Sequence, residues 1–133
     1  MIDFSTAYWR GFHKWVQAQG TSTGAGSTLC TLTPPAGYKY IIVCGAFSHN
    51  DVAARDVAIK WGDAGGNNSI GALTAVAQTI YTQLYSSIGS PPMPVVLDER
   101  SSLILETTAL GNTKVMTLNV VVVVLRGEDQ VVS

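Results

Sequence analysis

The longest apolar run of the chain is KVMTLNVVVVVL, residues Lys114–Leu125. β-branched residues dominate this run, and their stiff side chains suit a pleated strand better than a helix. With a period of two, one face of the strand is apolar throughout and should line the core. The members of that face are Met116, Leu118, Val120, Val122 and Val124.

The opposite face of the same strand is polar in its middle and apolar at its end, where it carries Val121, Val123 and Leu125. An outer face that turns apolar is usually covered by a second layer or by another chain. We therefore expect these three residues to be poorly buried in one subunit and to form an oligomer interface.

From residue 28 onward, short strand-like segments alternate with turns. The expected strands are Thr28–Leu32, Tyr38–Phe47, Val52–Trp61, Ile70–Ala75, Ala77–Ser87, Val95–Leu97, Ser102–Thr108 and the run at 114–125. The segment Ala77–Ser87 also fits a helix, and we interpret it as a strand. About eight short strands separated by turns predict an all-β sandwich or barrel.

Residues 1–27 differ in amino-acid composition from the rest of the chain. The first part is dense in aromatic side chains, namely Phe4, Tyr8, Trp9, Phe12 and Trp15. Most of these fall on one face of a helix, but Gly11 disfavours a helix, so an extended arm is the alternative. The segment Gly20–Ser27, GTSTGAGS, has the composition of a flexible linker. We predict an arm and linker over residues 1–27 and a sandwich domain over residues 28–133.

The composition limits the classes of function. Charged residues make up 13% of the chain, about half the usual share, so much of the surface is expected to face sister subunits or a larger partner. The net charge of −1 gives no electrostatic reason to bind nucleic acid or an anionic membrane. The uninterrupted run Val120–Leu125 is far shorter than the ~20 residues that cross a bilayer, and no signal peptide is recognisable.

The two cysteines, Cys30 and Cys44, both lie in apolar, strand-like contexts. We expect two buried free thiols in a reducing cytoplasm, with a disulfide as the alternative.

Polar clusters that could carry chemistry are few. His49, Asp51 and Asp56 match no familiar metal-ligand spacing, so we interpret them as a polar loop at a strand end. The loop Gly62–Ser69 has one acidic residue, too few for the oxygen ligands that Ca²⁺ takes. The segment Asp98–Arg100 is interpreted as a solvated turn with a local ion pair rather than an acid/base pair. Without a nucleophile or phosphate-loop motif, we predict no catalytic residue, no metal, no cofactor and no enzyme.

Aromatic residues on the expected strands could stack sugars. The candidates are Tyr38, Tyr40, Trp61, Tyr81 and Tyr85. Large aromatic residues on strands more often belong to the core or to an interface, which is the preferred interpretation. A sugar-binding platform stays open as the basis of an alternative function.

The order and composition of the segments in residues 28–126 resemble those of a known group of proteins. The Gly/Ser/Thr-rich lead-in is followed by PPAGYKYIIV at residues 34–43 and by PVVLDERSSLILETTALGNTKVMTLNVVVVVL at residues 94–125. This order resembles the small jelly-roll proteins of tailed bacteriophages, above all the capsid cement (head decoration) proteins. The resemblance implies an antiparallel β-sandwich of jelly-roll type with about eight strands. It also implies a homotrimer at the three-fold positions of the capsid, with an N-terminal segment that grips the shell.

The leading hypothesis is therefore a virion structural protein on the capsid surface, assembled in the host cytoplasm. As a trimeric cement protein it would bind the major capsid protein and stabilise the assembled shell by linkage. Its anchors would be aromatic, as in interface hot spots: Phe4, Tyr8, Trp9, Phe12 and Trp15. The alternative is a carbohydrate- or receptor-binding jelly-roll module of a phage tail or fibre. That role needs aromatic residues on the surface with amide and acid groups around them.

Overall fold

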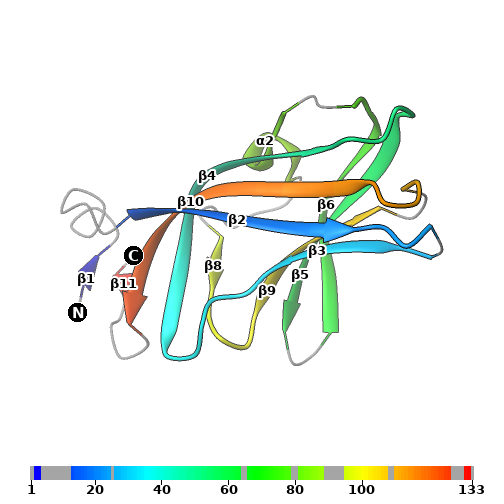
Figure 1. The fold of residues 1–133 in the computed structure, drawn as a ribbon. Helices are drawn as coiled ribbons and strands as arrows, with labels where there is room; N and C mark the ends of the chain where they lie inside the picture. Colours follow the sequence, from blue (N-terminus) through cyan, green and yellow to red (C-terminus); the bar gives the residue numbers. More distant parts are fainter. Residues whose placement is uncertain are drawn as a thin grey trace.

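The computed structural model describes residues 2–3, 13–24, 26–63, 66–78, 81–88, 95–107, 110–126 and 131–132 (Figure 1). Its elements are β1 (Ile2–Asp3), β2 (His13–Thr21), β3 (Thr28–Leu32), β4 (Tyr38–His49), β5 (Arg55–Asp63), β6 (Gly66–Val76), β7 (Thr82–Gln83), α2 (Leu84–Ser87), β8 (Val96–Leu97), β9 (Ser102–Thr107), β10 (Val115–Arg126) and β11 (Val131–Val132). Within the described residues, no helix is long and apolar enough to span a membrane.

Two antiparallel sheets form the sandwich. The first has the order β2-β10-β4-β7, with β8 also paired to β4, and the second has the order β3-β9-β5-β6. The strand pairs are nested one inside the next, as in one long antiparallel hairpin. From the outermost to the innermost they are β2 with β10, β3 with β9, β4 with β7 and β8, and β5 with β6. The pairs β10–β4 and β9–β5 close this rolled hairpin into two sheets. The order is that of a jelly roll, and the predicted fold class is confirmed.

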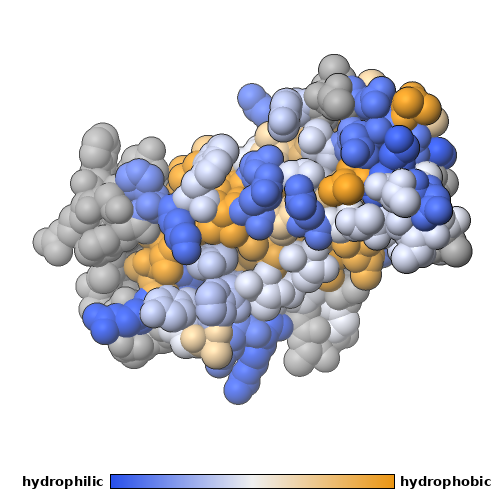
Figure 2. Space-filling model, in the orientation of Figure 1, coloured by the Kyte–Doolittle hydropathy of each residue, from blue (hydrophilic) through white to orange (hydrophobic). Residues whose placement is uncertain are grey.

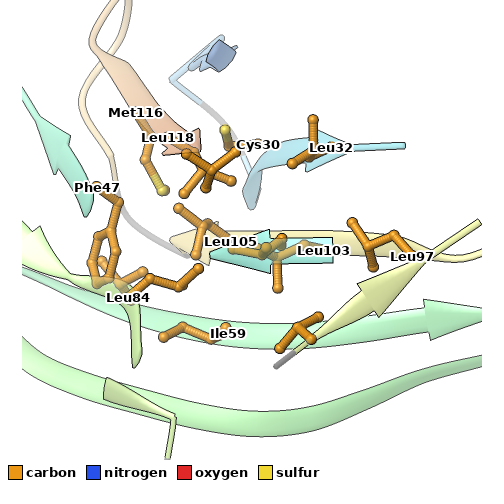
Figure 3. Close-up of a cluster of buried hydrophobic side chains, with 14 of the residues drawn as sticks. Cys30, Leu32, Phe47, Ile59, Leu84, Leu97, Leu103, Leu105, Met116 and Leu118 are labelled. Carbon is orange, nitrogen blue, oxygen red and sulfur yellow. The ribbon is translucent and has the colours of Figure 1, made fainter. Parts of the chain in front are cut away.

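The main core lies between the two sheets, and β10 supplies much of it. Met116, Leu118, Val120 and Val122 are all 0% exposed, which confirms the predicted inward face. Figure 3 shows Met116 and Leu118 close to Leu105 of β9, with Ile59 of β5 on the far side of the cluster. Val124, at the end of the same face, is only half-buried and packs against this cluster.

The outer face of β10 does not behave as predicted. Val123 is 0% and Leu125 is 2% exposed within the single chain, so their predicted poor burial in one subunit is wrong. The reason is a second apolar cluster, in which both residues pack with Ile41 and Val43 of β4. Val121 is half-buried. That Val121, Val123 and Leu125 form an oligomer interface stays a prediction.

The chain before residue 28 also differs from the prediction. Residues 13–21 form β2, which pairs with β10 from Val115 to Val123, so they belong to the sandwich rather than to an arm. Gly20 lets β2 lie close to β3, because a Cβ there would lie 2.1 Å from the Leu29 carbonyl oxygen of β3. Of the predicted anchors, Trp15 lies on β2, whereas Phe4, Tyr8, Trp9 and Phe12 lie outside the described residues.

The predicted linker contains a fixed turn at Ser22. Its side chain is buried, its hydroxyl donates to the Leu110 carbonyl oxygen at 2.8 Å, and its N–H donates to the Lys114 carbonyl oxygen at 2.8 Å. These bonds hold the turn against the loop that precedes β10, so small polar residues do not make this segment a flexible tether.

The predicted strand Ala77–Ser87 is wrong over most of its described length. Only Thr82 and Gln83 pair with β4, and the single turn α2 follows at once. The turn places Leu84, which is 0% exposed, in the core and directs Tyr85 to β4. A predicted strand start at Val52 is also wrong, because β5 begins at Arg55.

Candidate functional site

A depression lies on the outer face of the first sheet. We call it the sheet groove, and its volume is about 590 Å³. Its lining residues are Trp15, Cys44, Gly45, Ala46, Tyr81, Gln83, Tyr85 and Asn119. They come from β2, β10, β4 and β7 and from the residues around α2, so the groove crosses the whole sheet.

The floor of the groove is low because β4 carries small residues there. Cys44 and Ala46 point outward, and neither fills the space above the sheet. Between them, Gly45 faces Val120, where a Cβ would lie 2.6 Å from Val120 Cγ1. A glycine is therefore needed for the close approach of β4 and β10 beneath the groove.

Two of the aromatic walls are strongly exposed. Trp15 is 68% and Tyr81 is 70% exposed, so neither ring contributes much to the core. Trp15 lies opposite Val121 of β10, which in turn lies opposite Cys44 of β4. Directly paired residues point to the same side of a sheet, so the indole stands beside the low floor.

The third aromatic wall, Tyr85, is held in place by its hydroxyl group. The hydroxyl donates to the Ile42 carbonyl oxygen of β4 and accepts from the Val95 N–H at 2.9 Å. Burial raises the pKa of Tyr85, so its hydroxyl stays protonated and able to donate. The ring is therefore pre-organised, and a ligand does not have to order it.

The described lining of the groove is uncharged but carries hydrogen-bonding groups. No Asp, Glu, Lys or Arg is among its described lining residues. The Gln17 amide donates to Asn119 Oδ1 at 3.0 Å, which leaves the amide N–H group of Asn119 available to donate. Gln83 adds a second amide on the side of Tyr81. The arrangement suits an uncharged ligand that has both apolar faces and hydroxyl groups.

The residues His49 and Asp51 form a structural hub instead of a reactive site. His49 Nε2 donates to the Val76 carbonyl oxygen at 2.7 Å, and its Nδ1 accepts from the Asp51 N–H at 3.1 Å. The Asp51 carboxylate accepts from the N–H groups of Ala53 and Gly111 at 3.0 and 2.7 Å. These two backbone bonds lower the pKa of Asp51 to about 2, and Arg55, paired with it at 3.0 Å, contributes less.

This hub joins the end of β4 to the loop before β10, which accounts for both buried side chains. Asp56 is exposed, and the described residues hold no group of three or more His, Cys, Asp or Glu side chains that could bind a metal ion. The side chain of Asp63, in the loop considered for calcium, lies outside the described residues.

The turn Asp98–Arg100 is held by backbone bonds. Asp98 Oδ1 accepts from the Arg100 N–H at 2.8 Å, and Glu99 Oε2 accepts from the Gly37 N–H at 2.7 Å. The predicted local ion pair is wrong, since Arg100 forms no ion pair with Asp98 or Glu99 among the described residues. The physical reason is that each carboxylate already has a backbone donor nearby.

The structure divides the five aromatic residues considered for sugar stacking. Tyr40 is buried, Trp61 packs partly buried against the core, and Tyr38 lies exposed near the Asp98–Arg100 turn. Only Tyr81 and Tyr85 reach the sheet groove.

Sequence reasoning missed the role of Trp15, Gln17 and Asn119 in this groove. The signal was present in HKWVQAQGT, residues 13–21, where Trp15, Gln17 and Gln19 alternate with smaller or apolar residues. A period of two there marks a strand with a polar and aromatic outer face.

The two cysteines occupy different environments. Cys30 is 0% exposed, and burial raises the pKa of its thiol to about 11. Cys44 is exposed on the floor of the groove, and both thiols are free. The predicted burial is thus wrong for Cys44, because its side chain points to the outer face of the sheet.

Comparisons with known proteins add little to this geometry. No family model matches the chain, and no curated protein matches it. Among solved structures, the chain is similar to the C-terminal family 22 carbohydrate-binding module of Clostridium thermocellum Xyn10B, at 13% sequence identity. The likeness covers 83% of this chain and 85% of that one with a TM-score of 0.34. A likeness of this size carries no weight for function, which must be argued from the side chains of the groove.

Proposed function

We propose that this chain is a carbohydrate-binding jelly-roll module that holds an uncharged glycan in the sheet groove. The observation that carries the proposal is the meeting of Trp15, Tyr81 and Tyr85 around a floor of small side chains. Sugar rings have apolar C–H faces, which pack on aromatic rings, and hydroxyl edges, which bond to amides. A phage tail or fibre that contacts a cell surface is the setting in which such a module would act.

The absence of charged side chains among the described lining residues favours a sugar over other ligands. Anionic ligands such as nucleotides need Arg, Lys or a cluster of N–H donors, and charged peptides need ions of opposite sign. The described lining instead offers amides and aromatic faces. We also expected acid groups around a sugar site, but none of the described lining residues is acidic, so neutral sugars fit the groove better than basic ones.

The exposed Cys44 thiol on the floor of the sheet groove allows a direct test of glycan binding there. Uncharged oligosaccharides are screened for binding, and alkylation of Cys44 by iodoacetamide is then followed by mass spectrometry. A ligand present at ten times its Kd should slow the alkylation about tenfold, since only the free fraction of the protein reacts. Cys30 is the internal control, because it is buried and should react only after unfolding.

A panel in which no uncharged glycan binds would refute the proposal. A glycan that binds but leaves the rate of Cys44 alkylation unchanged would place the site elsewhere on the molecule.

A capsid cement protein is the second candidate. It is favoured by the charge content of 13% and by large apolar side chains exposed away from the groove, among them Leu29, Val52 and Val96 at 49%, 79% and 42%. In the view of Figure 2, hydrophobic residues reach the surface in several places between hydrophilic ones. Such a surface fits contact with other chains.

For this candidate, light scattering should give a mass near three times 14.1 kDa, and the protein should bind particles that carry the major capsid protein. A chain that begins at His13 keeps β2 and tests the predicted anchors Phe4, Tyr8, Trp9 and Phe12. It should trimerise but no longer bind particles. A monomer at micromolar concentration would contradict the homotrimer, and unchanged particle binding would contradict the anchors.

A further inference from the structure

A second depression adjoins the sheet groove and shares Tyr81 with it. We call it the polar depression, and its volume is about 260 Å³. Its lining residues are Gln19, Ser48, His49, Asn50, Tyr81, Val115 and Thr117. Because the exposed Tyr81 ring borders both hollows, one ligand can touch the ring and enter both of them.

The strand register places the two hollows along β10. Trp15, Val121 and Cys44 form one row across three strands, which we call the aromatic row. Gln19, Thr117 and Ser48 form a parallel row, which we call the polar row. Thr117 and Val121 are four residues apart on one strand, so the rows are separated by about 13 Å. That length exceeds a single sugar ring.

Between these rows lies a third, formed by Gln17, Asn119, Ala46 and Gln83. Three of its four side chains are amides, and the fourth is small. Along β10 the described side chains between the two hollows are therefore amides and one small residue, and the large side chain that borders both hollows is the Tyr81 ring.

The two ends of this face differ in chemistry. Trp15 and Tyr85 provide aromatic rings near the aromatic row. The polar row instead provides the amide of Gln19 and the hydroxyl groups of Ser48 and Thr117. Among the described residues, the side chains of Gln19, Ser48 and Thr117 make no hydrogen bond to another residue, so their polar groups are free for a ligand. Hydroxyl and amide groups recognise the pattern of sugar hydroxyls, and rings supply apolar contact.

The polar depression also has a fixed wall. Asn50 Oδ1 accepts from the Val115 N–H at 2.8 Å, so its amide N–H group points away from that bond. The neighbouring His49 ring is locked by its two bonds. The depression therefore does not have to form when a ligand arrives.

Resting on the proposed carbohydrate-binding function, we infer that the site takes a chain of several uncharged sugars laid along β10. One end of the chain stacks in the sheet groove, the middle crosses Tyr81, and the other end bonds to Gln19, Ser48 and Thr117. The aromatic end supplies most of the affinity, and the polar end selects the sugar.

The test uses the full chain and homologous series of uncharged oligosaccharides, one to six units long, built from glucose, galactose, mannose or xylose. Calorimetry should show affinity that rises with length over the first few sugars and then stays constant. The combined variant S48A and T117V should weaken binding of the longer members about tenfold and leave binding of the shortest binding member unchanged. Thr31→Val, an exposed threonine on β3 of the other sheet, is the matched control and should change neither.

The outcomes separate the two claims. If the native chain binds no sugar of any length, the carbohydrate-binding function and the extended site are both overturned. If short and long members bind equally well and the double variant has no effect, the function stands and the extended site is overturned. A double variant that weakens short and long members alike would also overturn the extended site, because it would place the polar row beneath the first sugar.

Discussion

Replacing Trp15 with alanine is expected to weaken glycan binding about 30-fold while the protein stays folded. The indole is 68% exposed, so its removal takes little area from the core. In a binding site the same ring acts as an anchor, and truncation of an aromatic anchor costs about 2 kcal/mol, which corresponds to about 30-fold in Kd. Calorimetry on the tightest oligosaccharide measures the change.

Two further variants make the result specific to the groove. Trp15→Phe keeps an aromatic face and should retain most of the affinity. Tyr38→Ala removes an exposed tyrosine outside the groove and should have no effect. If Trp15→Ala binds as tightly as the native chain, the groove is not the site, whatever glycan the chain binds.

The second large effect is expected at the hub of the fold. Replacing Asp51 with alanine should lower the midpoint of thermal unfolding by roughly 10 °C. The variant leaves the N–H groups of Ala53 and Gly111 and the Arg55 side chain without their acceptor. Two of these donors belong to loops that the carboxylate ties together, so the loss affects both. Asp56→Ala, at an exposed aspartate five residues away, should change the midpoint little.

The effect of Asp51 should also depend on pH with a defined sign. Its pKa in the folded chain is about 2, below the value of about 3.9 that an unfolded chain would have. The carboxylate therefore stabilises the fold fully above about pH 4, and this contribution is lost as the pH falls towards 2. The difference in midpoint between the native chain and Asp51→Ala should shrink over that range. A difference that stays constant from pH 6 to pH 2 would contradict the role assigned to the charge.

Much of the fold could be predicted from local patterns because a strand with one buried face repeats every two residues. Met116, Leu118, Val120 and Val122 occupy every second position of β10, and they all line the core. The same period in residues 13–21 was hidden by two features that favour other structures, the aromatic density before it and the glycines after it. Pairing with β10 overrides both, since it satisfies the backbone of residues 13–21.

The burial of Val123 and Leu125 could not be predicted in this way. Periodicity shows which residues share a face, but it does not show what covers that face. The cluster with Ile41 and Val43 depends on which strand lies beside β10, and Ile41 is more than 80 positions away in the chain.

The sequence by itself determined the class of fold, because alternation and turns are local properties of neighbouring residues. It also determined the low charge of the surface. Only the tertiary structure decided the site. Trp15, Cys44, Tyr85 and Asn119 come from distant parts of the chain, and the rolling of one long hairpin into two sheets brings them together on one face. That contact depends on strand order and register, which no single stretch of the chain contains.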